Sequence, residues 1–387
     1  MRAGFLVTPG EARSLGLGKV PALDKHIRPY LNGRDLLQRP RGQMVIDLFG
    51  LREDEVRRRF PAVYQRVLLR VKPEREQNNR TSYKENWWIF GEPRLELRRA
   101  VIGIKKIIVT PVTAKHRVFS FLDVDMIPDD ALISIAVDDP FILGVLSSHI
   151  HISWSISSGG TLEDRPRYLK SSCFDAFPFP VANRSQRAEI AAIAEELDAH
   201  RKARLAAYPH LTLTALYNVL AAIRAGTPLT PAERDTHDAG QVSILRTLHD
   251  RLDAAVAAAY GWPADLPDAD IVARVVALNA ERAAEEADGN IRWLRPEFQA
   301  PEETRRRAVQ REMDVGEGAV AGLLPWPKDA PSQFTVLRAA LTAAPASARD
   351  VARRFKGAPR PGKLEEMLAT LAALGQARPA GGSRYAA

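Results

Sequence analysis

The sequence predicts an α+β protein, in which a mixed α/β region is followed by an α-helical region and a winged-helix-like module. Three observations support this class. Short β-type runs alternate with helical patterns over residues 1–180, and Ala-, Glu- and Arg-rich helical patterns cover residues 181–315. After a Pro- and Gly-rich linker at 316–330, three short helical patterns and a hairpin pattern occupy residues 331–387.

In the first region, the predicted strands and helices are separated by irregular loops, which is typical of a domain that binds its partner through loops. Proline and glycine recur between its elements, and such loops commonly carry recognition on a rigid scaffold. We expect helices over 53–71 and 141–148. We expect strands over 44–48, 106–110, 118–121 and 132–137.

The helical region begins after Phe177-Pro178-Phe179-Pro180, because each X-Pro pair favours extended backbone. Asn183 or Ser185 is then suited to cap a long helix that runs to about Tyr208. Further helices are expected at 212–225, 238–260 and 268–287, with Gly226 and Gly261 where C-terminal caps belong. Taken alone, this region is interpreted as a scaffold or spacer.

The cysteine count and the lengths of the apolar runs exclude several classes of protein. The chain has 387 residues and one cysteine, Cys173, which excludes an intrachain disulfide framework and favours a reducing compartment. No apolar run approaches the roughly 18 residues that a membrane span needs, and no secretory signal is visible at the N-terminus. We therefore expect a soluble, cytoplasmic protein of two or three domains.

Positive charge is concentrated at the two ends of the chain. The net charge of +8 divides into +13 for residues 1–117, −6 for 118–180, −5 for 181–329 and +6 for 330–387. Clustering of this kind is typical of proteins that bind phosphate backbones. The alternative is that the excess charge only solvates two surfaces.

A search for catalytic motifs finds no complete one. The glycine-rich string 316–321 follows a charged helical pattern rather than a buried strand, so it lacks the context of a cofactor loop. His149 and His151 have no third ligand at metal-binding spacing. Asp138-Asp139-Pro140-Phe141 lacks the second proline and the tyrosine of an amino-methyltransferase tetrad, so Asp139 more simply caps a helix. We predict no catalytic residue, no metal site and no cofactor in this chain.

Several strings, in order, resemble the target-recognition region of the MmeI-like (type IIL) restriction–modification adenine methyltransferases. The resemblance covers residues 4–300, and it includes helical strings such as Leu248-His249-Asp250-Arg251-Leu252-Asp253 and Tyr260-Gly261-Trp262-Pro263. The recognition-region strings are Arg28-Pro29-Tyr30-Leu31-Asn32-Gly33-Arg34-Asp35-Leu36, Val71-Lys72-Pro73-Glu74-Arg75, Trp87-Trp88-Ile89-Phe90, Thr113-Ala114-Lys115-His116-Arg117, Arg165-Pro166-Arg167-Tyr168 and Phe174-Asp175-Ala176-Phe177-Pro178-Phe179-Pro180.

The resemblance implies a part of an N6-adenine DNA methyltransferase. Family members are longer and carry upstream an S-adenosylmethionine loop and an Asn-Pro-Pro-Tyr tetrad, and this chain begins after both. It is therefore expected to be a split specificity subunit or a C-terminal fragment in restriction–modification or phage defence. It would bind double-stranded DNA, be inactive alone, and rely on S-adenosylmethionine held by a catalytic partner or missing domain. Two alternatives stay open: a protein-interaction scaffold, and an active methyltransferase with an unrecognised cofactor site.

For base readout we favour the segment 159–170, because it mixes acids and bases, and both are needed to distinguish base edges. Its candidates are Glu163, Arg165, Arg167, Tyr168 and Lys170. A solvated loop with local ion pairs is the alternative. Further candidates for DNA backbone or base contact are Asn32, Arg34, Lys72, Arg75, Asn79, Arg80, Thr113, Lys115, His116 and Arg117.

The C-terminal module carries a basic face of its own. Arg353, Arg354, Lys356 and Lys363 fall on its predicted second and third helices, where a winged helix contacts either DNA or protein. For Trp87 and Trp88 we favour one buried ring and one ring at an interface over base stacking.

Overall fold

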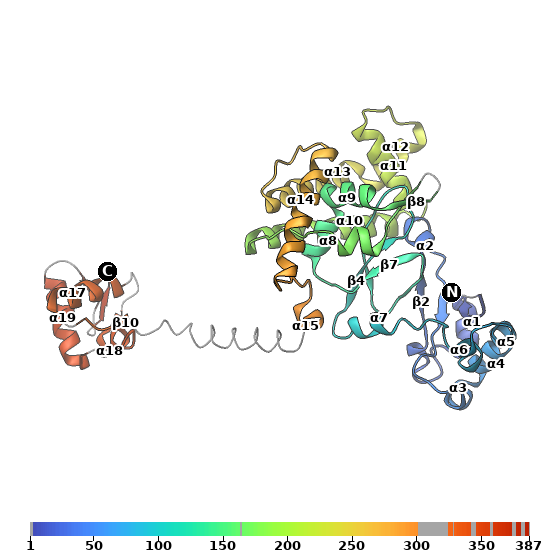
Figure 1. Cartoon of the computed structure of the whole chain (residues 1–387), viewed down its shortest axis with the longest axis horizontal. Coiled ribbons are helices and arrows are strands. Elements are labelled where there is room, and N and C mark those ends of the chain that lie inside the picture. Colours follow the sequence, from blue (N-terminus) through green and yellow to red (C-terminus); the bar gives the residue numbers. More distant parts are fainter. Residues whose placement is uncertain are drawn as a thin grey trace. The chain divides into compact units, whose positions relative to one another are not determined.

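The computed structural model describes residues 3–162, 165–300, 324–327, 329–341, 346–356, 359–373, 377–380 and 384–386. The chain forms two compact units, Met1–Leu294 and Arg295–Ala387. The predicted α+β class is confirmed, because small sheets lie among many helices (Figure 1). The predicted glycine-rich string at 316–321 lies outside the described residues, as does most of the predicted linker. The predicted domain bounds stay a prediction.

The first sheet of the larger unit has the strand order β1–β3–β2–β6. β3 (Met44–Ile46) pairs antiparallel with β1 (Leu6–Val7) and with β2 (Ile27–Leu31). β6 (Ile127–Pro128) runs parallel to β2 and brings a distant part of the chain to this sheet. The helices along this part of the chain are α1 (Pro9–Ser14), α2 (Gly33–Leu37), α3 (Glu53–Arg59), α4 (Pro61–Arg70), α5 (Lys72–Glu76), α6 (Thr81–Glu85) and α7 (Leu95–Ala100).

In this part of the chain, the structure differs from the sequence prediction at the helix 53–71 and shows the environments of Trp87 and Trp88. The helix expected at 53–71 is divided into α3 and α4, because Pro61 has no N–H to continue the first helix and instead begins the second. Trp87 is buried, and Trp88 donates its indole N–H to the Leu51 carbonyl at 2.9 Å. Trp87 is therefore the buried ring that the sequence predicts, and the hydrogen bond of Trp88 ties its ring to the fold, whereas a ring at an interface stays a prediction.

The central sheet has β4 (Lys106–Pro111) between β5 (Ser120–Asp123) and β7 (Leu132–Ile135), with both pairs antiparallel. Its strands overlap the runs that the sequence predicts. Ile108 lies opposite Phe121 on one side and Ile135 on the other, and all three side chains are buried. The central sheet thereby positions the turn that follows β4 and the helices that pack on the sheet.

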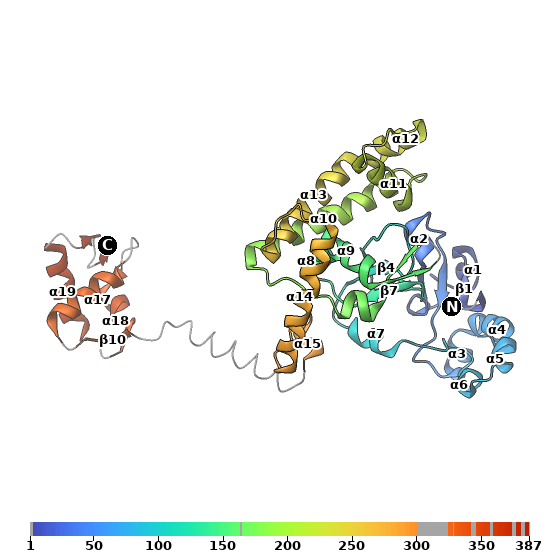
Figure 2. The ribbon, with the colours of Figure 1, turned by 45° about the horizontal axis from the view of Figure 1, so that its top comes forward.

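The helices that follow share one hydrophobic core with the central sheet, from Ile108 of β4 to Val275 of α14. Asp139 caps α8 as expected, since its Oδ1 accepts the Phe141 N–H at 2.9 Å. Gly144 allows α8 to approach α10, because a Cβ there would lie 2.6 Å from Ile190 Cγ2. The helices are α8 (Pro140–Ser147), α9 (His149–Ser158), α10 (Arg184–Ala207), α11 (Leu213–Arg224), α12 (Pro231–Gly240), α13 (Val242–Tyr260) and α14 (Asp268–Ala287) (Figure 2).

Buried polar groups add to this shared core. On α10, Asp198 Oδ1 accepts the Ser120 hydroxyl at 2.7 Å, and Arg201 Nη2 donates to the Phe119 carbonyl at 2.8 Å. Arg201 Nη1 also donates to the Tyr217 hydroxyl on α11 at 3.0 Å. Buried bonds to charged groups are costly to break, so they fix the helices on the sheet.

In the described part of the smaller unit, α17, α18 and α19 and a following pair of antiparallel strands lie at the positions where the sequence predicts three helices and a hairpin. Its core includes Leu337, Val351, Leu364 and Leu368. β11 (Ala346–Ser347) and β13 (Arg378–Pro379) pair antiparallel with β14 (Arg384–Ala386). The other elements are α15 (Pro296–Gln299), β10 (Leu324–Pro325), α17 (Ala330–Ala340), α18 (Ala348–Ala352), β12 (Phe355–Lys356) and α19 (Pro361–Ala373). Among the described residues of the whole chain, no helix is long and apolar enough to cross a membrane.

Tyr168 lies in the core of the larger unit, so the prediction that it reads bases is wrong. Its side chain is only 1% exposed and its hydroxyl lies 2.9 Å from His151 Nε2. Burial lowers the pKa of His151 to about 3, so the ring is neutral and its Nε2 shares a hydrogen bond with the Tyr168 hydroxyl. The ring of Tyr168 also packs edge-on against Phe119 at 5.5 Å between centroids.

Replacing Tyr168 tests this structural role. Tyr168→Phe keeps the ring but leaves a buried nitrogen of His151 without its hydrogen-bond partner, so we expect a loss of about 1–3 kcal/mol in unfolding free energy. Tyr168→Ala also removes the ring and should cost about 3–5 kcal/mol. Urea denaturation followed by circular dichroism measures both. Wild-type stability in Tyr168→Ala would contradict the burial of this side chain.

Two buried neutral histidines predict a pH-dependent stability. The pKa of His151 and that of His249 are each lowered from 6.5 to about 3, chiefly by burial. Below pH 6.5 the unfolded chain binds protons that the folded chain excludes, so stability falls as the pH drops from 6.5 toward 3. Each histidine contributes a slope of about 1.4 kcal/mol per pH unit.

Denaturation midpoints measured between pH 7 and pH 4.5 test this slope. His249→Gln retains an acceptor for the Tyr217 hydroxyl, which lies 2.9 Å from His249 Nε2, and should flatten the slope. The same change at the exposed His210 is the matched control. Equal slopes in wild type and His249→Gln would show that His249 does not titrate as described.

Candidate nucleic-acid interface

The segment favoured for base readout is a β-hairpin. β8 (Gly160–Leu162) pairs antiparallel with β9 (Arg165–Arg167). Arg165 and Arg167 are exposed and, two residues apart on a strand, point to the same face. Lys170 is also exposed, at the start of a π-helical turn, and its Nζ lies 2.6 Å from Asp175 Oδ2. Glu163 lies outside the described residues.

Gly159 joins this hairpin to α9, and its lack of a side chain matters. A Cβ at that position would lie 2.5 Å from the Arg167 carbonyl oxygen and 2.6 Å from the Ser155 carbonyl oxygen. Only glycine lets the end of α9 approach the hairpin this closely. The hairpin is thereby held close to the end of α9, and Arg165 and Arg167 of β9 are exposed.

The turn after β4 lies against the same hairpin. Thr113 forms a β-bridge with Arg167, and the Tyr168 N–H donates to the Val112 carbonyl at 2.7 Å. The Ala114 N–H donates to the Pro166 carbonyl at 3.3 Å. The structure therefore brings together the first and second candidate segments of the sequence, 165–170 and 113–117.

Arg117 joins these two segments from inside, so its predicted role in DNA contact is wrong. Its side chain is buried and donates to Thr110 Oγ1 at 3.1 Å, to the Pro166 carbonyl at 3.1 Å and to the Pro111 carbonyl. Burial lowers the pKa of Arg117 to about 10, which leaves the guanidinium charged at neutral pH. Its carbonyl partners take the place of water.

Lys115 and His116 stand at the edge of this turn and contact α11. Lys115 Nζ and His116 Nε2 each lie 2.8 Å from Asn218 Oδ1. Lys115 is exposed, whereas partial burial lowers the pKa of His116 and favours its neutral ring. Lys115 is thus the member of this pair that can offer a positive charge to a phosphate.

The candidates at α2 have different environments. Asn32 caps this helix, because its Oδ1 accepts the Asp35 N–H at 2.8 Å, which is the structural turn role. Arg34 is exposed. The nearby Arg41 forms a two-point ion pair with the buried Asp35, at 2.7 and 3.0 Å.

The candidates at α5 and α6 lie around the other core, beside the first sheet. Arg75 is only 3% exposed, with its guanidinium 4.5 Å from the Tyr83 ring centroid, so its predicted DNA contact is wrong. Lys72 is partly buried and lies over Trp87, with Nζ 5.3 Å from the ring centroid. Asn79 and Arg80 are exposed.

The smaller unit exposes Arg353, Arg354 and Lys363. Arg354 Nη1 donates to the Ala340 carbonyl at 2.5 Å, and so also ties the end of α17 to α18. Lys356 belongs to β12, but its side chain lies outside the described residues.

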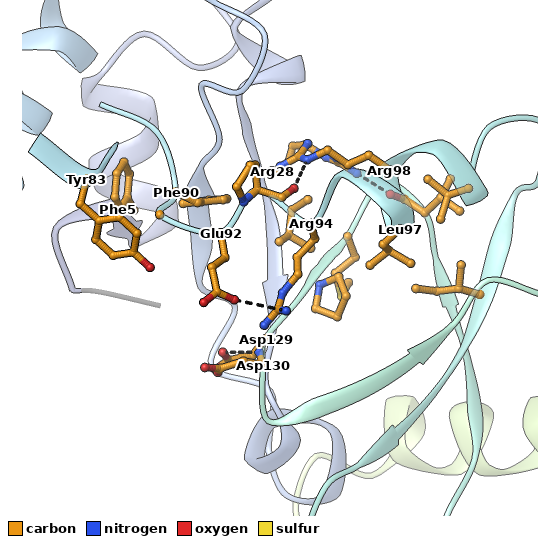
Figure 3. A pocket seen from close by; sticks show the side chains of 18 of the residues that line it. Phe5, Arg28, Tyr83, Phe90, Glu92, Arg94, Leu97, Arg98, Asp129 and Asp130 are labelled. Carbon is orange, nitrogen blue, oxygen red and sulfur yellow. Dashed lines mark hydrogen bonds and ion pairs between the residues drawn. The ribbon is translucent and has the colours of Figure 1, made fainter. Parts of the chain in front are cut away.

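A cavity of about 370 Å³ lies between the first and central sheets (Figure 3). Two arginines on its wall have partners of opposite charge: Arg98 Nη1 is 2.9 Å from Asp47 Oδ2, and Arg94 Nη1 is 3.3 Å from Glu92 Oε2. Arg28 instead donates to the main-chain carbonyls of Val124 and Asp125. Of the predicted DNA-contact residues, only Arg75 lines this cavity.

The two histidines considered for metal binding have other partners. His149 Nε2 lies 2.8 Å from Asp268 Oδ1, whereas His151 is bonded to Tyr168. They begin α9 instead of lying on a strand or turn. In the described part of the chain, no group of three or more His, Cys, Asp or Glu side chains is placed to hold a metal ion.

Sequence reasoning missed the part that α11 plays in this interface. Asn218 contacts Lys115 and His116, and Thr214 Oγ1 accepts the side-chain N–H of Gln38 at 2.8 Å. These partners are separated by more than one hundred residues of sequence, and no local pattern links them.

Comparison with known proteins agrees with this fold. Residues 2–181 match the sequence family described as "MmeI, target recognition domain". A similar solved structure is the type IIL restriction–modification enzyme MmeI in complex with DNA, with a TM-score of 0.54 and 22% sequence identity. The likeness covers 73% of this chain and 34% of that chain, so this chain matches about a third of that enzyme's length. No curated protein matches. Residues 2–181 are therefore similar in sequence to the target recognition domain of MmeI.

Proposed function

We propose that this chain recognises a DNA sequence for an N6-adenine DNA methyltransferase, as its specificity subunit or as part of a longer enzyme. The observation that carries the proposal is that the β8–β9 hairpin and the turn after β4 are joined and form one exposed edge. On it, Arg165 and Arg167 are presented beside Lys115. The family match of residues 2–181 and the likeness to a DNA-bound enzyme support the same function.

These residues are assigned to two kinds of DNA contact, to base edges and to phosphates. Arginine can donate two hydrogen bonds to the O6 and N7 of guanine, so Arg165 and Arg167 are assigned to base readout. Lys115 and Arg34 are assigned to phosphates, where a charge positions the duplex without reading it. Lys170 stays a proposed base-readout residue. A hairpin is a suitable carrier, because the major groove admits a two-stranded ribbon.

The smaller unit is proposed to be a winged helix that adds contacts independent of sequence. The order of its elements, with α18 and α19 followed by the β13–β14 hairpin, is compatible with that fold. Arg353 and Lys363 are exposed there, and the segment 330–387 carries a net charge of +6. Phosphate contacts from this unit would raise affinity for every duplex alike.

Methyl transfer itself is assigned to a catalytic partner chain or to a further domain. The proposed reaction places a methyl group from S-adenosylmethionine on the exocyclic N6 of adenine, after the base leaves the duplex. This chain would hold the duplex in register during that step. A cytoplasmic restriction–modification or phage-defence system is the setting we infer.

Binding to DNA tests the readout assignment. Selection from a random duplex library should first enrich a site, and fluorescence anisotropy then measures affinity for it. Arg165→Ala and Arg167→Ala should each weaken binding by about 1–3 kcal/mol and relax preference at one base pair. Arg353→Ala with Lys363→Ala should instead lower affinity for all duplexes equally and reduce the salt dependence.

Arg251→Ala is the matched control, because Arg251 is an exposed arginine on α13 whose Nη1 lies 3.1 Å from Glu196 Oε2. It should leave the selected site unchanged. Equal binding to all sequences, unaffected by Arg165→Ala and Arg167→Ala, would refute the readout assignment. Complete absence of DNA binding at low salt would favour the alternative, a protein-interaction scaffold.

Methylation assays test the division of labour. With duplex DNA and tritiated S-adenosylmethionine, the purified chain should transfer no methyl group. Addition of a catalytic chain encoded beside it should yield N6-methyladenine within the selected site. Transfer by this chain alone, or S-adenosylmethionine binding to it in calorimetry, would instead establish a cofactor site of its own.

A further inference from the structure

Two of the segments proposed to face DNA are both held by one helix of the helical region. The segment 32–41 contains Asn32 and Arg34, and the segment 113–117 contains Lys115 and His116. On α11, Thr214 contacts the first segment and Asn218 contacts the second. These two residues are one helical turn apart, so they lie on the same face of α11.

The contacts to the first segment combine side chains and main chain. Thr214 Oγ1 accepts from Gln38 Nε2 at 2.8 Å and donates to the Leu37 carbonyl at 3.3 Å. Just before α11, the His210 carbonyl accepts from Arg39 Nη2 at 3.3 Å. The C-terminal end of α2 is thereby fastened to α11.

The contacts to the second segment define the orientation of the Asn218 amide. Its Oδ1 lies 2.8 Å from both Lys115 Nζ and His116 Nε2. An ammonium group only donates hydrogen bonds, so the oxygen rather than the NH₂ of Asn218 must face it. A neutral His116 then donates through Nε2, which fixes its tautomer.

The core-facing side of α11 is anchored. Leu213, Leu216 and Leu220 are buried, and the Tyr217 hydroxyl lies 2.9 Å from His249 Nε2 and 3.0 Å from Arg201 Nη1. Because α11 is fixed on this side, its other side can hold the two segments at a set separation.

We propose that Asn218 and Thr214 are positioning residues, through which α11 sets the placement of segments 32–41 and 113–117 against the DNA. The helical region then positions the residues that face DNA and is more than a spacer. This inference rests on the proposed function. It assigns no DNA contact to Asn218, which acts through Lys115 and His116.

A double-mutant cycle on the full chain tests the inference. Asn218→Ala should weaken binding to the selected duplex about tenfold, because Lys115 and His116 lose their shared acceptor. In the Lys115→Ala/His116→Ala background, the same change should have less than a twofold effect. Asn290→Ala is the matched control, because Asn290 is an exposed asparagine at the end of α14. It should bind like wild type.

Nuclear magnetic resonance of ¹⁵N-histidine-labelled protein without DNA gives an independent readout. Wild type should show His116 as the fixed Nε2–H tautomer, and Asn218→Ala should show a mixture of tautomers with an unchanged denaturation midpoint. Asn218→Asp retains acceptor oxygens and should restore the fixed tautomer.

The possible failures are distinguishable. Full additivity of the cycle, or wild-type affinity in Asn218→Ala, would overturn the inference while leaving DNA recognition in place. No duplex binding by wild type would overturn the proposed function. An unchanged His116 spectrum in Asn218→Ala would overturn the positioning role, whatever the binding result.

Discussion

The exposed edge of this protein depends on one buried guanidinium. Arg117 donates to the Thr110 hydroxyl, the Pro111 carbonyl and the Pro166 carbonyl, and so joins the end of β4 to the β8–β9 hairpin. Without it, two buried acceptors and one partly buried acceptor would lose a charged donor at once. Lys115 on one side and Arg165 and Arg167 on the other are held together by this contact.

The edge in turn depends on the core that the central sheet shares with the helices. Gly144 lets α8 approach α10, and Gly159 lets α9 approach the hairpin. Asp198 and Arg201 add buried hydrogen bonds between α10 and the segment 119–120. Residues 2–181, which match a target recognition domain, therefore share one hydrophobic core with the helices that follow. Through this core, α11 is held in a fixed place beside the segments that it contacts.

Local features were predictable from the sequence and distant ones were not. The caps at Asp139 and Asn183 follow from hydrogen bonds between residues two or three apart, and both are present. The segment around Arg165 was singled out by its mixed charges, and it projects as an exposed hairpin. The predictions that Tyr168 and Arg117 contact DNA are wrong, because both side chains are buried. Tyr168 is hydrogen-bonded to His151, and Arg117 to the Pro166 carbonyl, and no periodicity in the sequence links these pairs.

In the proposed function, the β8–β9 hairpin enters DNA at the recognised site. Site-specific photo-crosslinking tests it most directly, with a photoreactive amino acid at Leu162, which is 55% exposed on β8, and at Ile244 on α13, which is 46% exposed, as the control. We expect adducts from position 162 to bases inside the selected site, and none from position 244. Adducts from 162 that are absent or spread evenly along the duplex would contradict it.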